Sequence, residues 1–275
     1  MRAVTNSLER ALAILELIEG NPGGLRHAEI CRQMRIPKST CSYIVARLEK
    51  HGYLARDAET GRYRIGLSTV TLAHGALREV GLRAIAEPAL YRLAGATGLS
   101  AGIGVLERGH VLVIDRVEGA EFVRDAVHVA EGLPLRWAVR SRRYRVRADR
   151  DIGRELPVHS SALGKVLLAF LPGPQVLALI AEKGLPRQTR NTITSQARLL
   201  RELREVRRLG YATAVEEMTG IRAIAAPIYG PSNVVTAGVS LNGSPAEPAW
   251  ANPDELADLV KAAAREISRR ARFRD

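Results

Sequence analysis

Residues 25–66, LRHAEICRQMRIPKSTCSYIVARLEKHGYLARDAETGRYRIG, carry the clearest structural signal in the chain. Apolar residues recur at helical spacing over residues 25–34, which predicts a first short helix. The Arg-Ile-Pro sequence of residues 35–37 ends it, because a residue before proline is pushed out of the α region. A second helix is expected over residues 38–51, and Gly52 stops it. Two short helices separated by a tight turn predict a helix-turn-helix unit.

The second helix has an apolar face and a polar face. The polar face carries hydroxyl groups and cations near the helix start. Such a helix can enter a DNA major groove, while its N-terminus favours phosphate. The candidate groove contacts are Lys38, Ser39, Thr40, Ser42, Tyr43 and Arg47.

Two strands are expected after this helix, over residues 53–56 and 62–65, joined by a hairpin loop with glycine near its end. Arg56, Arg62 and Arg64 lie on this hairpin and would hold phosphates or reach the minor groove. The complete pattern predicts a winged helix-turn-helix. The alternative is a small helical subdomain for protein contacts, whose surface arginines are only solvated.

Composition and charge agree with a nucleic-acid partner. The 275 residues include 41 Lys and Arg against 29 Asp and Glu, a net charge of +12, which suits a polyanion. The two cysteines, Cys31 and Cys41, fall on apolar helical faces, so we interpret them as small core residues rather than a disulfide or a metal site. That usage is typical of a reducing cytoplasm. No N-terminal apolar run is long enough for a signal or a membrane span, so a cytoplasmic protein with no membrane contact is expected.

The remaining patterns predict a two-domain α+β protein. A helix over residues 5–19, with an apolar stripe through Leu8, Leu12 and Ile18, would complete a three-helix core. Helices over residues 67–80 and 82–96 would connect the domains and pair with a second copy, or would simply belong to the next core. From residue 99 onward, strands joined by hairpins alternate with helices, which favours a mostly antiparallel sheet. The predicted boundaries are 4–66 for the winged helix, 67–82 for the linker helix and 83–275 for the second domain.

Several separated motifs, in order along nearly the whole chain, resemble the IclR family of bacterial transcriptional regulators. They are SLERALAILELI, PKST and LEKHGYLARDAETGRYRIG in the first part, and LPVHSSALGKVLLAFL, GYATAVEE and GIRAIAAPIYGPSNVVTAGVSLNG in the second. The resemblance implies a homodimer or homotetramer that binds double-stranded operator DNA. It also implies a GAF-like domain that binds a small metabolite and controls a catabolic operon as a repressor or activator.

The resemblance also implies where an effector would bind. The family's ligand-contacting positions map onto Ser160, Ser161, Ala162, Thr213, Ala223, Ser240 and Asn242. Independently, residues 160–162 lie at a predicted helix start, whose free backbone amides can hold a carboxylate. Ser240 and Asn242 are two residues apart on a predicted strand and therefore share one face. The alternative is that these small side chains only fill a tight interior.

The chain departs from the family pattern at three places. Ser42 and Tyr43 replace a usual His-Arg pair on the recognition helix, so an arginine that could grip guanine is absent there and the operator is expected to differ. Ala223 and Thr213 stand where a cysteine and an acidic residue are usual, which removes candidate metal ligands. We therefore expect no metal and no cofactor, and an effector that combines an organic acid with an apolar, aromatic or alicyclic body. An insertion at residues 120–155 suggests a basic arm over residues 135–147, which would touch DNA, the cavity entrance or another subunit, or be a solvated face.

Two other classes of function were considered. A hydrolytic enzyme could use His159, Ser161 and Lys165, or the adjacent Glu216 and Glu217, but no catalytic motif is complete, so we expect no catalytic residues and no enzyme. An architectural DNA-binding protein would lack a cavity in its second domain and would bind without regard to sequence.

Overall fold

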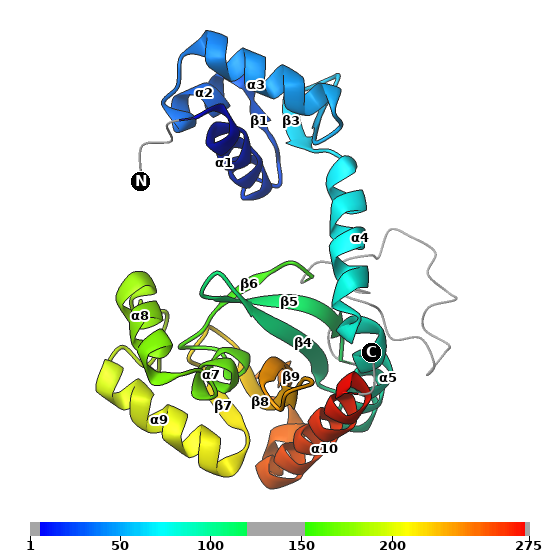
Figure 1. Ribbon diagram of the computed structural model, residues 1–275, viewed down its shortest axis with the longest axis vertical. Coiled ribbons are helices and arrows are strands. Elements are labelled where there is room, and N and C mark those ends of the chain that lie inside the picture. Colours follow the sequence, from blue (N-terminus) through cyan, green and yellow to red (C-terminus); the bar gives the residue numbers. More distant parts are fainter. Residues whose placement is uncertain (1–5, 120–151, 273–275) are drawn as a thin grey trace. The chain divides into compact units, whose positions relative to one another are not determined.

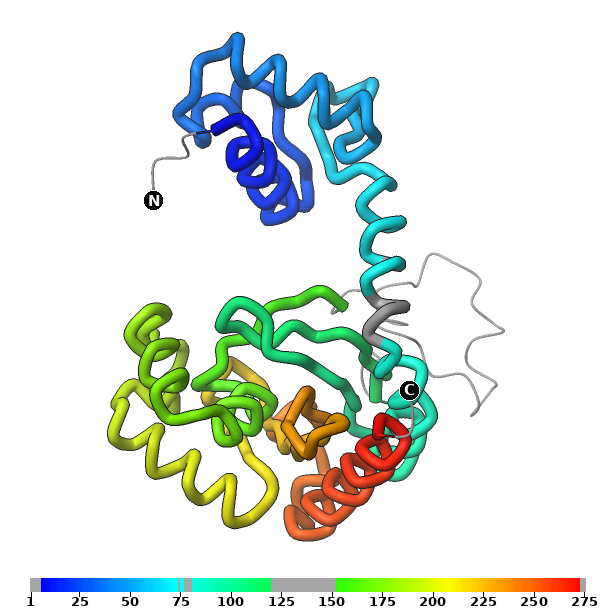
Figure 2. Tube along the Cα trace, viewed as in Figure 1, coloured from blue at the N-terminus to red at the C-terminus, as the bar shows by residue number. Residues whose placement is uncertain are grey.

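The computed structural model describes residues 6–119 and 152–272 and divides the chain into two compact units, Met1–Val80 and Gly81–Asp275 (Figures 1 and 2). Each unit is described by itself. The division assigns most of the predicted linker to the first unit. The predicted basic arm lies outside the described residues.

The first unit is a three-helix core with a small sheet, followed by a further helix. Its elements are α1 (Ser7–Glu19), β1 (Leu25–Arg26), α2 (His27–Met34), α3 (Lys38–Lys50), β2 (Leu54–Arg56), β3 (Arg62–Ile65) and α4 (Ser68–Val80). The three strands pair antiparallel in the order β1-β3-β2. This arrangement confirms the predicted winged helix-turn-helix.

Two details of the first unit differ from the sequence prediction. The helix expected from residue 25 begins at His27, because Leu25 and Arg26 pair with β3 as a short strand. Gly24 precedes that strand with φ +70°, and a side chain there would collide with the Tyr63 carbonyl, 2.7 Å away. On α1, Leu8 and Leu12 are 70% and 52% exposed. Ile18 of the predicted stripe is buried, together with Ile14, so the stripe meets the core along the edge that carries these two residues.

The second unit is a six-stranded antiparallel sheet covered on both faces, which confirms the predicted α+β class. Its helices are α5 (Leu82–Thr97), α7 (Ala162–Ala169), α8 (Gly173–Lys183), α9 (Gln196–Leu209) and α10 (Pro253–Arg272), with a short 3-10 helix η1 (Pro248–Ala251). Its strands are β4 (Ser100–Glu107), β5 (His110–Val117), β6 (Glu155–Pro157), β7 (Ala212–Val215), β8 (Arg222–Tyr229) and β9 (Val235–Gly243), in the order β6-β5-β4-β9-β8-β7.

The two faces of this sheet are covered by different helices. Helices α5 and α10 pack together against one face, and α7 packs against the other face with α9 behind it (Figure 1). α7 is buried along its whole length. Its Gly164 lies so close to Val158 that an added Cβ would be 2.3 Å from the Val158 carbonyl oxygen. This contact fixes the start of α7 against the sheet. Within the described residues, no helix is both long and apolar enough to cross a membrane.

Candidate DNA-binding surface and effector cavity

Helix α3 has one buried face and one exposed polar face, as a helix that reads DNA requires. Cys41, Ile44 and Val45 face the core, and the candidate groove contacts lie on the opposite side. Lys38, Ser39, Ser42, Tyr43 and Arg47 are exposed, and Thr40 is half-buried. The Arg47 guanidinium lies over the Tyr43 ring, 5.3 Å from its centre.

The start of α3 is open to an anion. Pro37 occupies the N-cap position, and no side chain caps the helix there. The first backbone N–H groups of a helix have no partner within the helix, and together with the helix dipole they attract phosphate. The polar face of α3 and its uncapped start can therefore both donate hydrogen bonds to one phosphate-bearing ligand.

The three arginines of the wing have different surroundings. Arg56 and Arg64 are exposed, with the Arg64 side chain 55% exposed and 3.8 Å from a carboxylate oxygen of Asp57. Arg62 points inward instead. It donates to the Gly24 carbonyl at 2.7 Å and pairs with Glu29 of α2 at 3.2 Å.

The expectation that Arg62 holds phosphate therefore needs correction. Its guanidinium already ties the wing to α2. Glu29 is held in turn by the Arg26 backbone N–H, and this hydrogen bond, with the nearby arginines, lowers the pKa of Glu29. Alternation along β3 places Arg62 and Arg64 on the face opposite Tyr63. They differ because Arg62 pairs with Arg26 of β1, beside Gly24 and Glu29, whereas Arg64 pairs with Ala55 of β2.

A cavity in the second unit lies between the start of α7 and the sheet. Its volume is about 60 Å³. Most of its lining is apolar. Six of the seven predicted effector residues line it: Ser160, Ser161, Ala162, Ala223, Ser240 and Asn242.

The two serines before α7 have different partners. Ser161 is used by the fold, because its hydroxyl donates to the Pro157 carbonyl at 2.6 Å and accepts from the Gly164 N–H at 3.1 Å. Ser160 is fully buried, and its hydroxyl has no hydrogen-bond partner among residues 6–119 and 152–272. A buried polar group without a partner costs about 1–3 kcal/mol. An effector that supplies an acceptor to Ser160 would remove that cost.

Thr213 does not line the cavity, which corrects the prediction for this position. Alternation along β7 buries Ala212 and Ala214 and exposes Thr213, so Ala214 takes the place expected for it. Thr213 contributes through its backbone. Its carbonyl accepts a hydrogen bond of 2.9 Å from the ammonium group of Lys165, which is 1% exposed.

Two arginines that the sequence prediction missed also line the cavity. Arg116 reaches it from β5 and is held by Glu118, with Nε 3.0 Å from a carboxylate oxygen. Arg154 reaches it from the residue before β6. The sequence did offer a signal for Arg116, because it is a charged residue in a mostly apolar predicted strand. Arg154 lies just before β6 and offered none.

Comparison with known proteins finds a matching family model for each unit. Residues 7–58 match the model of the IclR helix-turn-helix domain, and residues 138–269 match the bacterial transcriptional regulator IclR C-terminal domain. The HTH-type transcriptional regulator BhcR of Paracoccus denitrificans is 31% identical over 263 residues, covering 95% of this chain and 86% of that protein. This chain belongs to the IclR family. The N-terminal unit is its DNA-binding domain, and the C-terminal unit is its effector-binding domain.

Further members of the family share the same two-part organisation. The transcriptional repressor IclR of Escherichia coli is 28% identical over 265 residues, with 95% of this chain and 88% of that protein covered. The crystal structure of an IclR homolog from Microbacterium hydrocarbonoxydans, complexed with 4-hydroxybenzoate, superposes with a TM-score of 0.76. It is 26% identical, and the match covers 98% of this chain and 100% of that one. This regulator is therefore a DNA-binding protein of a family that represses transcription.

The side chains considered for catalysis have structural partners in this regulator. His159 is buried and lies 3.0 Å from the Pro186 carbonyl through Nε2, and burial lowers its pKa. Lys165 pairs with Glu217 at 2.5 Å and with Glu202 at 3.2 Å. Burial raises the pKa of Glu217, although Lys165 opposes this. With the Ser161 hydroxyl committed to the helix cap, these groups do not converge on a reacting atom.

Proposed function

We propose that this regulator controls a catabolic operon and that an organic acid with an apolar body, bound in the cavity, sets its affinity for operator DNA. The observation that carries the proposal is the buried, unpartnered Ser160 hydroxyl in an apolar cavity that also contains two arginines. A carboxylate would accept from Ser160 and lie beside the positive charges of Arg116 and Arg154, and charge-assisted hydrogen bonds are about twice as strong as neutral ones. The apolar lining would then cover the remainder of the ligand.

The start of α7 adds to this preference for an anion. The backbone N–H groups at a helix N-terminus carry partial positive charge, and residues 160–162 line the cavity there. Gly102 forms part of the opposite wall. A side chain at this position would not clash severely with the protein, but it would occupy cavity space that glycine leaves to a ligand. These features suit a flat acid such as an aromatic carboxylate. The homolog solved with 4-hydroxybenzoate supports the same ligand class.

Isothermal titration calorimetry tests the ligand class. The full chain is titrated with 4-hydroxybenzoate and cyclohexanecarboxylate, with benzamide as the uncharged match, and with pyruvate and glyoxylate as small polar acids. We expect the acids with an apolar body to bind and benzamide to fail. If only pyruvate or glyoxylate bound, the proposed chemistry would be wrong.

Two variants make this test specific for the cavity. Ser160→Ala should weaken binding about tenfold or more, because it removes a hydrogen bond to a charged group, worth about 1.5–3 kcal/mol. Thr213→Ala is the matched control, since its exposed side chain lies outside the cavity and its backbone carbonyl is unchanged. Equal losses in both variants would show that Ser160 does not contact the ligand.

For DNA reading, we propose that the exposed face of α3 enters the major groove and that Arg56 and Arg64 hold the flanking backbone. The groove contacts are Lys38, Ser39, Thr40, Ser42, Tyr43 and Arg47. We further propose a dimer that reads an inverted repeat. Leu67, Val70 and Leu72 at the start of α4 are 84%, 59% and 59% exposed, and pairing with a second copy would cover them.

Fluorescence anisotropy with DNA from the regulator's own promoter region tests this arrangement. Thr40→Ala should change the order of affinity among operator variants, whereas Arg64→Ala should weaken all sequences alike and reduce the salt slope by about 1. Equal losses for Thr40→Ala on operator and unrelated DNA would contradict its role in reading bases. Sedimentation of Leu72→Lys should show a smaller assembly than the unmodified chain.

A further inference from the structure

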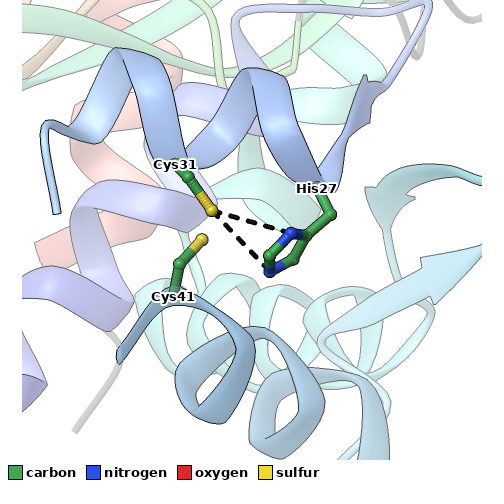
Figure 3. A group of neighbouring side chains, drawn as sticks. All are labelled: His27, Cys31 and Cys41. Atoms are coloured by element: carbon green, nitrogen blue, oxygen red, sulfur yellow. Dashed lines mark hydrogen bonds between the residues drawn. The ribbon is translucent and has the colours of Figure 1, made fainter. Parts of the chain in front are cut away.

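A histidine and both cysteines of the chain meet inside the helix-turn-helix (Figure 3). His27 and Cys31 lie one helical turn apart on α2, so their side chains share a face. Cys41 reaches them from the facing side of α3. One ligand atom from each residue lies within 4.8 Å of the others.

The separation of Cys31 and His27 matches that of two ligands on one small cation. The Cys31 sulfur is 3.6 Å from Nδ1 of His27 and 3.7 Å from Nε2. With a metal–sulfur bond of about 2.3 Å and a metal–nitrogen bond of about 2.05 Å, a tetrahedral angle places the two ligand atoms about 3.5 Å apart, and a trigonal angle about 3.8 Å apart. The observed distances lie between these values.

The hydrogen bond between His27 and Ser42 leaves one ring nitrogen for a cation. Nε2 is 3.0 Å from the Ser42 hydroxyl. In the tautomer in which Nε2 donates to this hydroxyl, Nδ1 carries the free lone pair and lies 3.6 Å from the Cys31 sulfur. Metal-binding histidines commonly donate their other ring N–H to a neighbouring oxygen, which fixes the tautomer and the ring orientation. Ser42 therefore stands where such a supporting partner is expected.

The surroundings of Cys41 favour its protonated thiol when no cation is bound. Cys41 is fully buried and Cys31 is 6% exposed. Burial, together with a hydrogen bond to Cys31, raises the pKa of the Cys41 thiol to about 12. Such thiols react slowly, because the thiolate is the reactive form. A cation would displace both protons, and the half-buried His27 leaves a path from solvent.

This cluster departs from the expectation that the two cysteines only fill the core and that the chain holds no metal. We propose that His27, Cys31 and Cys41 form a binding site for one thiophilic cation, Zn²⁺ or Cu⁺, inside the DNA-binding domain. Two thiolates and an imidazole form a ligand set that suits both ions. Cu⁺ is satisfied by three ligands, whereas Zn²⁺ prefers four and would keep a water molecule or an anion in the fourth position. This site is separate from the effector cavity and does not depend on the proposed effector.

The site would connect metal status to DNA recognition. The cation would tie α2 to α3 beside the residues that read DNA. Ser42 belongs both to the support of His27 and to the exposed face of α3. A bound cation fixes the His27 ring and with it the position of the Ser42 hydroxyl. We therefore expect the metal-loaded protein to bind DNA with altered affinity, while metal binding itself needs no DNA.

Metal titration of the full chain, prepared without a histidine tag and under reducing conditions, tests the proposal. Co²⁺ replaces Zn²⁺ in one arm, because thiolate ligands give it a charge-transfer absorption, and competition with Zn²⁺ then measures the Zn²⁺ affinity. A second arm titrates Cu⁺ under nitrogen against a colorimetric chelator. We expect one equivalent per chain in at least one arm, with tighter binding at higher pH because protons are released.

The variants separate this site from adventitious binding. His27→Gln should weaken binding by more than about a hundredfold, because losing even an outer partner of a metal ligand costs about 10–100-fold. His51→Gln is the matched control, since His51 is an exposed histidine at the end of the same helix pair. Cys31→Ser should abolish the Co²⁺ absorption, and thermal unfolding will show that this variant is folded.

One result would support the proposed metal site, and either of two others would overturn it. One equivalent bound by the unmodified chain and by His51→Gln, with loss in His27→Gln, supports the site. Failure of both Zn²⁺ and Cu⁺ to bind at one equivalent, or equal binding by His27→Gln, overturns it. The calorimetric test of the effector cavity is unaffected by either result.

Discussion

Replacement of Lys165 by methionine should destabilise the effector domain more than a typical buried substitution. Lys165 is 1% exposed, and its ammonium group contacts Glu217, Glu202 and the Thr213 carbonyl at 2.5, 3.2 and 2.9 Å. These contacts join α7, which carries the cavity serines at its start, to α9 and to the end of β7. Methionine keeps much of the volume and removes the charge.

The magnitude follows from what remains after the change. Glu202 is 37% exposed and can be hydrated, but the Glu217 side chain is 10% exposed and would keep an uncompensated charge. Removing one partner of a buried ion pair costs about 3–5 kcal/mol, whereas replacing both partners by apolar groups is often neutral. Lys165→Met should therefore lose about 3–5 kcal/mol near pH 7. The double variant with Glu217→Met should recover most of that loss.

The pH dependence of the same variant checks the cause. Burial raises the pKa of Glu217, and without Lys165 this pKa rises further. A carboxyl group whose folded pKa is raised contributes stability below its unfolded pKa of about 4.3, and this contribution is lost as the pH rises through the folded value. The deficit of Lys165→Met should therefore shrink on acidification. Urea denaturation across pH 5–8 measures it, and a deficit below about 1 kcal/mol at pH 7, or one that grows on acidification, would refute the reasoning.

Three further predictions concern other contacts. Burial lowers the pKa of His159, so the neutral imidazole contributes stability above pH 6.5, and this contribution is lost as the pH falls through the folded pKa. His159→Gln should therefore lose less stability than the unmodified chain between pH 7 and pH 5, as measured by urea titrations. Arg62→Ala should lower the thermal stability of the isolated residues 1–80 where Arg64→Ala does not, and equal melting temperatures would show that Arg62 does not brace the wing. Gly164→Ala should destabilise the chain and weaken effector binding, because its Cβ would lie 2.3 Å from the Val158 carbonyl oxygen; unchanged calorimetry would contradict this.

The sequence predicted the DNA-binding domain well because its signals are local. The Pro37 break, the spacing of apolar residues on α3 and the glycine of the hairpin loop each act over a few residues. The exceptions came from tertiary pairing. Leu25 and Arg26 were expected to start a helix, but they pair with β3, and Arg62 turned inward to meet Glu29. Such partners lie more than thirty residues apart and leave no local pattern.

The cavity was predicted in part, and through resemblance more than through local chemistry. The pair Ser240 and Asn242 could be placed on one wall from strand alternation alone, and both line the cavity. The prediction for Thr213 was wrong by one position, because Ala214 lines the cavity instead. A shift of one residue along a strand exchanges the two faces. The unpartnered state of the Ser160 hydroxyl depends on packing from several elements. The meeting of Cys31, Cys41 and His27 depends on how α2 crosses α3, which apolar spacing does not specify.

The central claim is that an acid bound in the effector domain changes how the winged helix holds DNA. The most direct measurement is the dissociation constant for promoter DNA, by anisotropy at fixed salt, without acid and with a saturating acid identified by calorimetry. The account predicts a change of about 5- to 150-fold, the usual range of coupling between two sites. Ser160→Ala should need about tenfold or more acid for the same change, and Thr213→Ala should respond as the unmodified chain does. An unchanged dissociation constant at saturation would contradict it.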